Sequence, residues 1–285
     1  MKKALLLFLA LALVISFASC TGGNNSQSGG GGGGAEEEEI VATLTIGASS
    51  SPHAEILEFL IPIMAQSGIG LEVIEFSDYV QPNVAVEDGS LDANFFQHQP
   101  YLDEFNAENG THIVSVCSVH YEPMCLYPGK DKGITLDSLP DGAQIALPND
   151  TTNEARALAV LEVNGLIKLK EGIGLNATIQ DIAENPKNFE FIEAEAATLP
   201  LALPDVDAAV INGNFALQGG LSATDDSIAF ESSESEAAQK YANILCVKEG
   251  NEENEAVLAL IQALRSDDCK EFIKEKYKGS VVPMF

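Results

Sequence analysis

Residues 41–47 read Val41-Ala42-Thr43-Leu44-Thr45-Ile46-Gly47, and Ser51-Pro52 follows shortly after them. A short run of apolar and β-branched residues is typical of a strand. Ser followed by Pro is a helix-start signal, so we predict Ser51 as the N-cap and Pro52 as the first helical residue. The helix would end near Gly68 and carry an apolar stripe of Ile56, Leu57, Leu60 and Met64. This stretch predicts a strand that leads directly into a helix.

The same succession of strand and helix recurs along the chain. We predict further strands at residues 71–76, 91–96, 144–147, 189–193 and 208–211. We predict further helices at residues 80–88, 151–165 and 254–277, the last in one or two pieces. Residues 151–154 have the spacing of a capping box. Such alternation is typical of an α/β fold with mostly parallel sheets.

Extended stretches around residues 114–127 and 241–247 join two blocks of this kind. We therefore predict two lobes between which the chain crosses twice. Residues 40–123 and 241–285 would form the first lobe, and residues 124–240 the second. In open α/β sheets, ligands bind beyond the carboxyl ends of strands, so we expect the binding residues to follow strands and to face a cleft between the lobes.

The first twenty residues have the pattern of a lipoprotein signal. Lys2-Lys3 precede an apolar run at residues 4–15, and small residues lead to Cys20. This predicts a signal peptide at 1–19 and a lipid on the Cys20 thiol; the alternative is an ordinary signal peptide with an incidental cysteine. Residues 20–39 would then be the lipidated cysteine and a Gly/Ser/Glu-rich tether. We expect the protein at the cell membrane, anchored by lipid on its extracytoplasmic face.

The charge of the chain limits its partners. It carries 15 Lys and Arg against 43 Asp and Glu, a formal net charge of −28. So negative a surface repels nucleic acid and anionic lipid headgroups, and no apolar run after the signal reaches membrane-spanning length. The remaining cysteines have no zinc spacing. We expect buried small hydrophobes and leave open one disulfide among Cys117, Cys125, Cys246 and Cys269.

Aromatic residues gather at the end of the predicted strand 91–96. Adjacent Phe95 and Phe96 point to opposite faces of a strand, so one can be core while the other lines a cleft. The alternative is that both are core. His98 and Tyr101 follow closely and add polar aromatics at the same place. This combination predicts an apolar pocket with a few orienting hydrogen bonds.

Polar residues follow two strands of the second block. Arg156 lies near the start of a predicted helix, where the helix dipole disfavours a cation. It could bind an anionic ligand group, for which a carboxylate fits best, or form a structural salt bridge with Glu154 or the other lobe. Asn212-Gly213-Asn214 is a plain turn or a pair of amides that grips a small zwitterion, and Asn153 could assist.

The sequence gives little sign of catalysis or of a metal. The histidines match no local metal motif, although a long-range site from His53, His98 and His120 stays open. Cys117 and His120 would face opposite ways in an extended segment, which argues against a thiol nucleophile. No motif of a hydrolase or nucleotide-binding enzyme is present. We expect no enzyme, no cofactor and no resident metal.

The chain resembles the methionine-binding lipoproteins of the NlpA/MetQ family, the substrate-binding components of methionine ABC importers. The matching stretches are residues 52–57 (PHAEIL), 76–83 (FSDYVQPN), 91–98 (LDANFFQH), 120–124 (HYEPM), 145–150 (IALPND), 153–158 (NEARAL), 207–214 (DAAVINGN) and 281–283 (VVP). The resemblance covers nearly all of the chain beyond the tether. It implies a two-lobed periplasmic-binding-protein fold that closes on its ligand.

The resemblance also implies a ligand site. Tyr79, Phe95, Phe96, His98 and Tyr101 would surround the thioether side chain, since sulfur packs well against aromatic rings. Arg156 would bind the ligand carboxylate. The polar part of the ligand would be held by Asn153, Asn212 and Asn214, with His120 as an addition from the crossover.

The resemblance implies a protein that captures L-methionine and delivers it to the permease and ATPase subunits of an ABC importer. Three departures from the family pattern bear on the ligand: Cys117, Cys125 and Ala155 stand where we expect glycines. A methionine dipeptide or another small amino acid is therefore an alternative ligand. A surface lipoprotein that acts in adhesion, an extracytoplasmic enzyme and a metal receptor are alternative functions.

Overall fold

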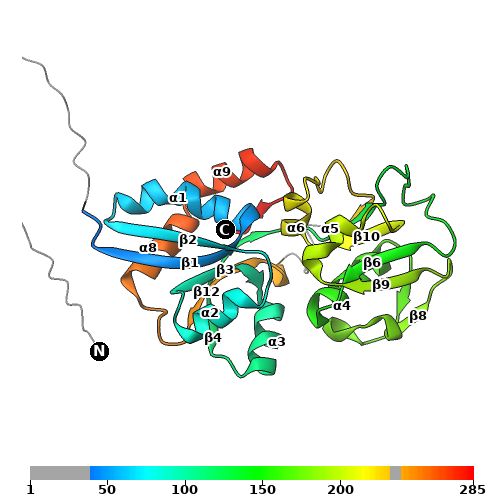
Figure 1. The fold of residues 1–285 in the computed structure, drawn as a ribbon, viewed down its shortest axis with the longest axis horizontal. Coiled ribbons are helices and arrows are strands. Elements are labelled where there is room, and N and C mark those ends of the chain that lie inside the picture. The colour runs from blue at the N-terminus through cyan, green and yellow to red at the C-terminus, as the bar shows by residue number, and fades with distance from the viewer. Residues whose placement is uncertain (1–38, 232–238) are drawn as a thin grey trace, which may run out of the picture. The chain divides into compact units, whose positions relative to one another are not determined.

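The computed structural model describes residues 39–231 and 239–285 (Figure 1). The predicted signal peptide, the lipidation site Cys20 and all but the last residue of the predicted tether lie outside the described residues. Residues Glu38–Phe285 form one compact unit. Across the described ranges, no helix is both long enough and apolar enough to span a bilayer.

The first sheet has six strands in the order β13-β4-β12-β3-β1-β2. Its strands are β1 (Ala42–Ser49), β2 (Ile69–Phe76), β3 (Ala93–His98), β4 (Ile113–Tyr121), β12 (Asn243–Lys248) and β13 (Val282–Pro283). Strand β1 pairs in parallel with β2 and β3, whereas β12 is antiparallel to both β3 and β4. The sheet is therefore mixed.

Helices cover both faces of this sheet. They are α1 (Glu55–Ala65), α2 (Gln81–Asp88), α3 (Gln99–Asn109), α8 (Glu255–Leu264) and α9 (Asp267–Tyr277). The strand period of two is visible in β12, where Leu245 and Val247 pack in the core with α1, α8 and α9. Ile244 and Cys246 point to the other face, toward α2 and α3.

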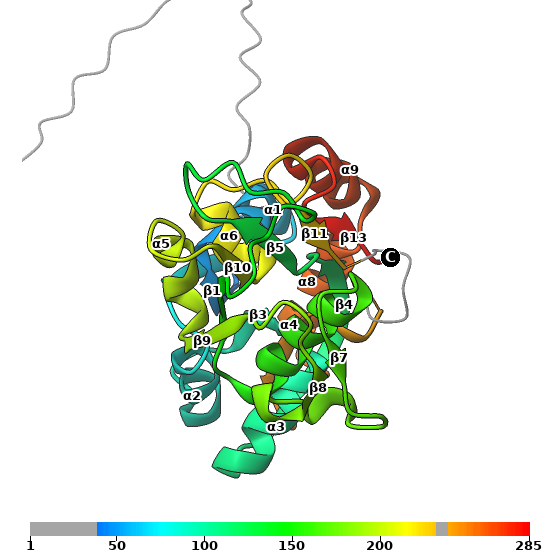
Figure 2. The same cartoon turned by 90° about the vertical axis from the view of Figure 1, so that its right-hand side faces the viewer.

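The second sheet has the order β11-β5-β10-β6-β9. Its strands are β5 (Cys125–Pro128), β6 (Gln144–Pro148), β9 (Glu190–Ala194), β10 (Ala208–Ile211) and β11 (Ala229–Phe230). Ala208 and Val210 of β10 pack toward α4 (Thr151–Val163). Ala209 and Ile211 pack on the other side, where α5 (Leu199–Ala202) and α6 (Gly213–Gln218) lie (Figure 2). A small sheet of β7 (Lys168–Leu169) and β8 (Ile182–Glu184) completes this part.

The chain passes from the first sheet to the second between Tyr121 and Cys125, and it is back in the first sheet at Asn243. The two-lobed α/β fold is thus present, with one sheet in each lobe. The prediction of mostly parallel sheets was wrong, because the crossover strands β4, β5 and β12 add antiparallel pairs to both sheets. The exact lobe limits at residues 123 and 240 stay a prediction.

Two of the four predicted helix starts differ from the structure in their capping residue. Ser51 has extended dihedral angles, as a residue before proline prefers, and α1 begins only at Glu55 after a short π-helical turn, Ser50–Ala54. The capping box at residues 151–154 is absent from the described structure. Asp150 is the N-cap instead, because its side chain accepts a hydrogen bond from the backbone N–H of Asn153.

The sequence also gave no sign of helix α3, which begins directly after β3. His98 is its N-cap: the ring nitrogen Nδ1 accepts a hydrogen bond from the backbone N–H of Tyr101 at 3.2 Å. Histidine is not among the preferred capping residues, so the start was hidden. Gly110 ends the helix in the left-handed conformation with φ of 64°.

Candidate ligand-binding site

A partly open pocket with about 330 Å³ of empty space, open solvent included, lies where the two sheets meet. Its lining residues are Tyr79, Phe96, Gln97, His98, Tyr101, Glu122, Asn153, Arg156, Asn212, Gly213, Asn214 and Asn243. The first sheet and its helices supply the aromatic residues, and α4 together with the start of α6 supplies Arg156 and most of the amides. Aromatic rings, amides and two charged side chains converge on this pocket, which is the kind of lining that binds a small polar molecule.

The first turn of α4 brings two polar side chains to the cavity. Asp150 caps the helix and also accepts a hydrogen bond from Asn153 Nδ2 at 2.8 Å. Asn153 Oδ1 in turn accepts from Asn212 Nδ2 at 2.8 Å and lies 3.2 Å from His98 Nε2. The Asn153 amide is thereby fixed, and it joins the two lobes across the cavity.

Arg156, one turn further along α4, is held by Glu231. Arg156 Nε donates to both Glu231 carboxylate oxygens, at 3.0 and 3.1 Å, and Nη2 donates to Oε2 at 2.6 Å. Nη2 also donates to the backbone oxygen of Glu122 at 2.9 Å. Burial alone would lower the pKa of Arg156, but the Glu231 carboxylate holds it above its ordinary value. Arg156 is therefore a fixed cation at the cavity wall.

Glu122 supplies the opposite charge at the same cavity. It follows β4 directly and is only 4 % exposed. Burial raises the pKa of Glu122, and the positive charge of Arg156 opposes the rise. Arg156 and Glu122 thus present a guanidinium and a carboxyl group to one pocket. This pairing matches the two charged groups of a zwitterion.

The apolar side of the cavity is aromatic. The ring centroid of Tyr79 lies 5.7 Å from those of both Phe96 and Tyr101 and 4.9 Å from that of Phe215. Tyr79 also donates a hydrogen bond from its hydroxyl to Asn214 Oδ1 in the other lobe at 2.6 Å. These rings give an unbranched apolar or thioether side chain a close-fitting wall.

Two side-chain amides at the cavity each have one polar atom without a hydrogen-bond partner among the described residues. The two atoms are Asn212 Oδ1 and Asn214 Nδ2, and both are buried. Both side chains lie at the junction of β10 and α6, where Asn212 is the N-cap residue. An unpaired buried acceptor and an unpaired buried donor are costly unless a ligand satisfies them. The sequence Asn212-Gly213-Asn214 is thus a helix start at the cavity and not a plain turn.

Of the ten predicted ligand-binding residues, the cavity brings eight together. Phe95 and His120 are the two that do not line it. Strand alternation turns Phe95 away from Phe96 and into the core of the first lobe. There the Phe95 ring contacts the rings of His53 and His120, with centroids 4.8 and 5.3 Å apart. His120 lies behind Glu122.

The sequence reasoning missed four lining residues: Gln97, Glu122, Gly213 and Asn243. It also missed Glu231, the partner of Arg156. Glu122 had a usable signal, since it is an acidic residue within the otherwise apolar crossover. Glu231 had none, because it lies in an acidic stretch 75 residues away from Arg156. The salt bridge considered with Glu154 does not form, because Glu154 instead accepts a hydrogen bond from the Ile179 N–H.

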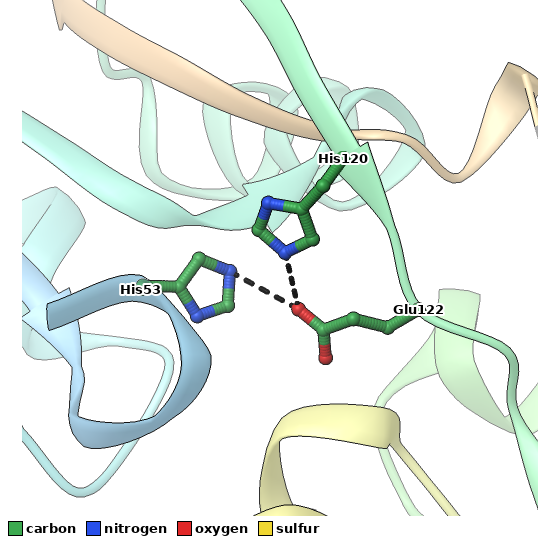
Figure 3. A group of neighbouring side chains, drawn as sticks. All are labelled: His53, His120 and Glu122. Carbon is green, nitrogen blue, oxygen red and sulfur yellow. Dashed lines mark hydrogen bonds and ion pairs between the residues drawn. The ribbon is translucent and has the colours of Figure 1, made fainter. Parts of the chain in front are cut away.

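His53, His120 and Glu122 form a buried group with potential metal-ligand atoms within 4.8 Å of one another (Figure 3). It differs from the predicted combination, because His98 is not a member. His120 Nε2 lies 2.7 Å from Glu122 Oε1, and His53 Nε2 lies 3.4 Å from the same oxygen. Burial lowers the pKa of His53 to about 4 and of His120 to about 3, so both rings are neutral near pH 7.

Comparison with known proteins gives concordant matches. A family model described as NlpA lipoprotein matches residues 44–285. The membrane lipoprotein TpN32 of Treponema pallidum is 43 % identical over 240 residues, which cover 84 % of this chain and 87 % of TpN32. The D-methionine-binding lipoprotein MetQ of Escherichia coli is 42 % identical over 217 residues, with coverage of 75 % and 78 %. The solved structure of a nutrient-binding protein from Burkholderia cenocepacia, bound to methionine, is 45 % identical with a TM-score of 0.80; the match covers 85 % of this chain and 100 % of that one.

Proposed function

Because the chain belongs to the NlpA lipoprotein family, we propose that it is the methionine-binding component of an ABC importer. The observation that carries the proposal is the pocket between the lobes, in which Arg156, Glu122 and an aromatic wall lie together. An α-amino acid with a thioether side chain has a group for each: a carboxylate for Arg156, an ammonium group for Glu122 and the thioether for the aromatic wall.

The two charged residues give the ligand its orientation. Arg156 binds the ligand carboxylate, assisted by the free amide donor of Asn214. Glu122 binds the ammonium group, with the free carbonyl of Asn212 as a second acceptor. The thioether then lies against Tyr79 and Phe96, where sulfur–aromatic contacts are favourable by about 0.3–1.5 kcal/mol.

The ligand also favours closure of the lobes. Residues on both sides of the cavity would contact it, so methionine binds more tightly to the closed arrangement than to an open one. The hydrogen bond from Tyr79 to Asn214 closes the aromatic side of the cavity. No bond of the ligand is made or broken in this role, and the ATP would be hydrolysed by a separate subunit of the importer.

Calorimetric titration tests the ligand. The protein is unfolded and refolded to remove bound ligand, and L-methionine, D-methionine, glycyl-methionine and leucine are added in turn. We expect one-to-one binding of L-methionine and loss of binding in Arg156→Ala. The matched control is Arg265→Ala, because Arg265 is the other arginine of the chain and is exposed on the surface. No heat with any amino acid, from a protein shown to be folded, would refute the methionine assignment.

The membrane attachment is a separate proposal. Cys20 carries lipid and residues 21–39 tether the domain to the extracytoplasmic face of the membrane, where it meets the permease. Relatives such as TpN32 are membrane lipoproteins. Cys20→Ser should move the protein from the membrane fraction to the soluble fraction and abolish incorporation of labelled palmitate. Unchanged membrane retention and labelling in the variant would contradict the anchor.

A further inference from the structure

We propose that His120, supported by His53, is a positioning residue that makes the site selective for ligands with a free amino group. It does so by donating a hydrogen bond to Glu122 from behind without adding a positive charge. The inference rests on the proposed function, in which Glu122 binds the ligand ammonium group. It adds a role for two histidines that do not themselves touch the ligand.

The hydrogen-bond partners fix which ring nitrogen carries the proton. His120 Nε2 lies 2.7 Å from Glu122 Oε1, and His53 Nε2 lies 2.9 Å from Asn243 Oδ1. Both partners accept hydrogen bonds, and a neutral imidazole has one N–H. The Nε2–H tautomer therefore satisfies both contacts. It leaves Nδ1 of each ring as a bare lone pair, which agrees with the absence of any partner for these two atoms among the described residues.

The same geometry argues against a metal ion in this group. Tetrahedral ligands about 2.0 Å from a zinc ion are about 3.3 Å apart, whereas His120 Nε2 and Glu122 Oε1 are 2.7 Å apart, a hydrogen-bond distance. A metal on Nε2 would also move each proton to Nδ1. Both Nδ1–H groups would then be buried donors without an acceptor, although histidine ligands normally have one.

The neutrality of the rings matters for the ligand. A protonated histidine next to Glu122 would cancel its charge and compete with the ligand ammonium group. The rings of His53 and His120 are fully enclosed, and Phe95 packs edge-on against both of them. Such burial disfavours the charged imidazolium. The histidines thus orient the carboxylate and leave its negative charge for the ligand.

The test compares two ligands that differ only in the amino group, L-methionine and 4-methylthiobutanoate. In His120→Leu, we expect the affinity for L-methionine to fall about 10- to 100-fold, the range for a hydrogen bond to a charged group. The affinity for 4-methylthiobutanoate should change less than threefold. Glutamine can place an N–H near the position of Nε2, so His120→Gln should recover most of the loss. Adding His120→Leu to Glu122→Gln should lower the affinity for L-methionine little further, because His120 acts through the Glu122 carboxylate.

Several outcomes would overturn the inference. A merely structural His120 would lower the affinity for both ligands alike, and glutamine would then give no rescue. Methionine binding that chelator abolishes and Zn²⁺ restores would establish a metal site instead. If His120→Leu does not fold, the pair His120→Gln and His120→Asn decides, because asparagine is too short to reach Glu122 and should bind poorly. Failure of the unmodified protein to bind L-methionine would refute the proposed function itself, which this experiment measures first.

Discussion

Replacing Glu231 by glutamine tests the ion pair that holds Arg156. In the folded protein the Glu231 carboxylate accepts three hydrogen bonds from the guanidinium, at 2.6 to 3.1 Å. The two side chains are only 4 % and 7 % exposed. Glu231→Gln would therefore leave a permanent positive charge in the interior without a carboxylate bonded to it.

The expected loss of stability follows from this burial. Removing one partner of a buried ion pair costs about 3–5 kcal/mol. The amide oxygen of glutamine can still accept from the Tyr121 hydroxyl and the Met124 N–H, which now donate to Glu231 Oε2. We therefore expect a loss at the lower end of this range, a fall of about 3 kcal/mol in the free energy of unfolding. For a domain of this size, that corresponds to a Tm lower by about 6–12 °C.

Urea unfolding and thermal melting of the ligand-free protein measure this loss. Ligand must be removed first, because a bound ligand adds stability of its own. Glu271→Gln is the matched control: it breaks the Lys274 pair at 3.0 Å, but both side chains are more than half exposed. Such an exposed pair contributes about 0–1 kcal/mol. The double variant Arg156→Met with Glu231→Leu removes both charges and should be more stable than Glu231→Gln alone.

Two results would refute this reasoning. One is a loss of unfolding free energy in Glu231→Gln that is as small as the loss in Glu271→Gln. This would mean that the interior solvates the unpaired guanidinium. The other is a double variant less stable than Glu231→Gln, which would mean that packing and not charge holds Arg156 in place.

Three further predictions concern the site. Tyr79→Phe removes one hydrogen bond between the lobes. It should weaken methionine binding about tenfold in calorimetry and leave the urea midpoint nearly unchanged. An affinity equal to that of the unmodified protein would contradict this. Gly213→Ala places a Cβ 2.6 Å from Glu122 Cβ, so methionine binding should be lost. The control is Gly89→Ala, where nothing lies within 4 Å of the new Cβ and only a φ of 83° is strained. This control should lower stability and leave the affinity for methionine intact. Burial, with Arg156 nearby, lowers the pKa of His98 to about 3 against 6.5 in the unfolded chain, so protonation favours unfolding as the pH falls below 6.5. Between pH 7.5 and 5.0, the free energy of unfolding of the unmodified protein should fall by about 2 kcal/mol more than that of His98→Gln. If the urea midpoints of the two proteins change with pH in parallel, the assignment is refuted.

Much of the fold could be predicted from local sequence patterns. The strand Ala208–Ile211 has the predicted bounds, and helix α2 ends at Asp88, the predicted last residue. Gly89 follows it in the left-handed conformation. The predicted membership of the NlpA family is confirmed. The helix starts were less predictable, because several capping residues stand next to one another at residues 150–153. In the structure Asp150 is the cap, since its side chain accepts a hydrogen bond from the Asn153 N–H. Helix α3 was hidden behind a histidine cap.

The site was predictable in its residue types and less so in its contacts. Phe96 and Arg156 line the cavity as the resemblance implied, and the adjacent Phe95 does not. Strand alternation required that only one of the two phenylalanines face the cavity, but which one depends on which face of β3 is covered by the core. The role of Phe95 is to enclose the histidines behind Glu122.

The sequence by itself determined the alternation of strands and helices, the strand ends at which the binding residues lie, and the family. These features depend on neighbours a few positions apart, so local patterns record them. Only the tertiary structure decided that Arg156 is paired with Glu231, and that Glu122 stands between two neutral histidines and the cavity. Such contacts join residues up to 75 positions apart, and burial sets their charge states. A linear sequence specifies neither which distant side chains meet nor how much water remains around them.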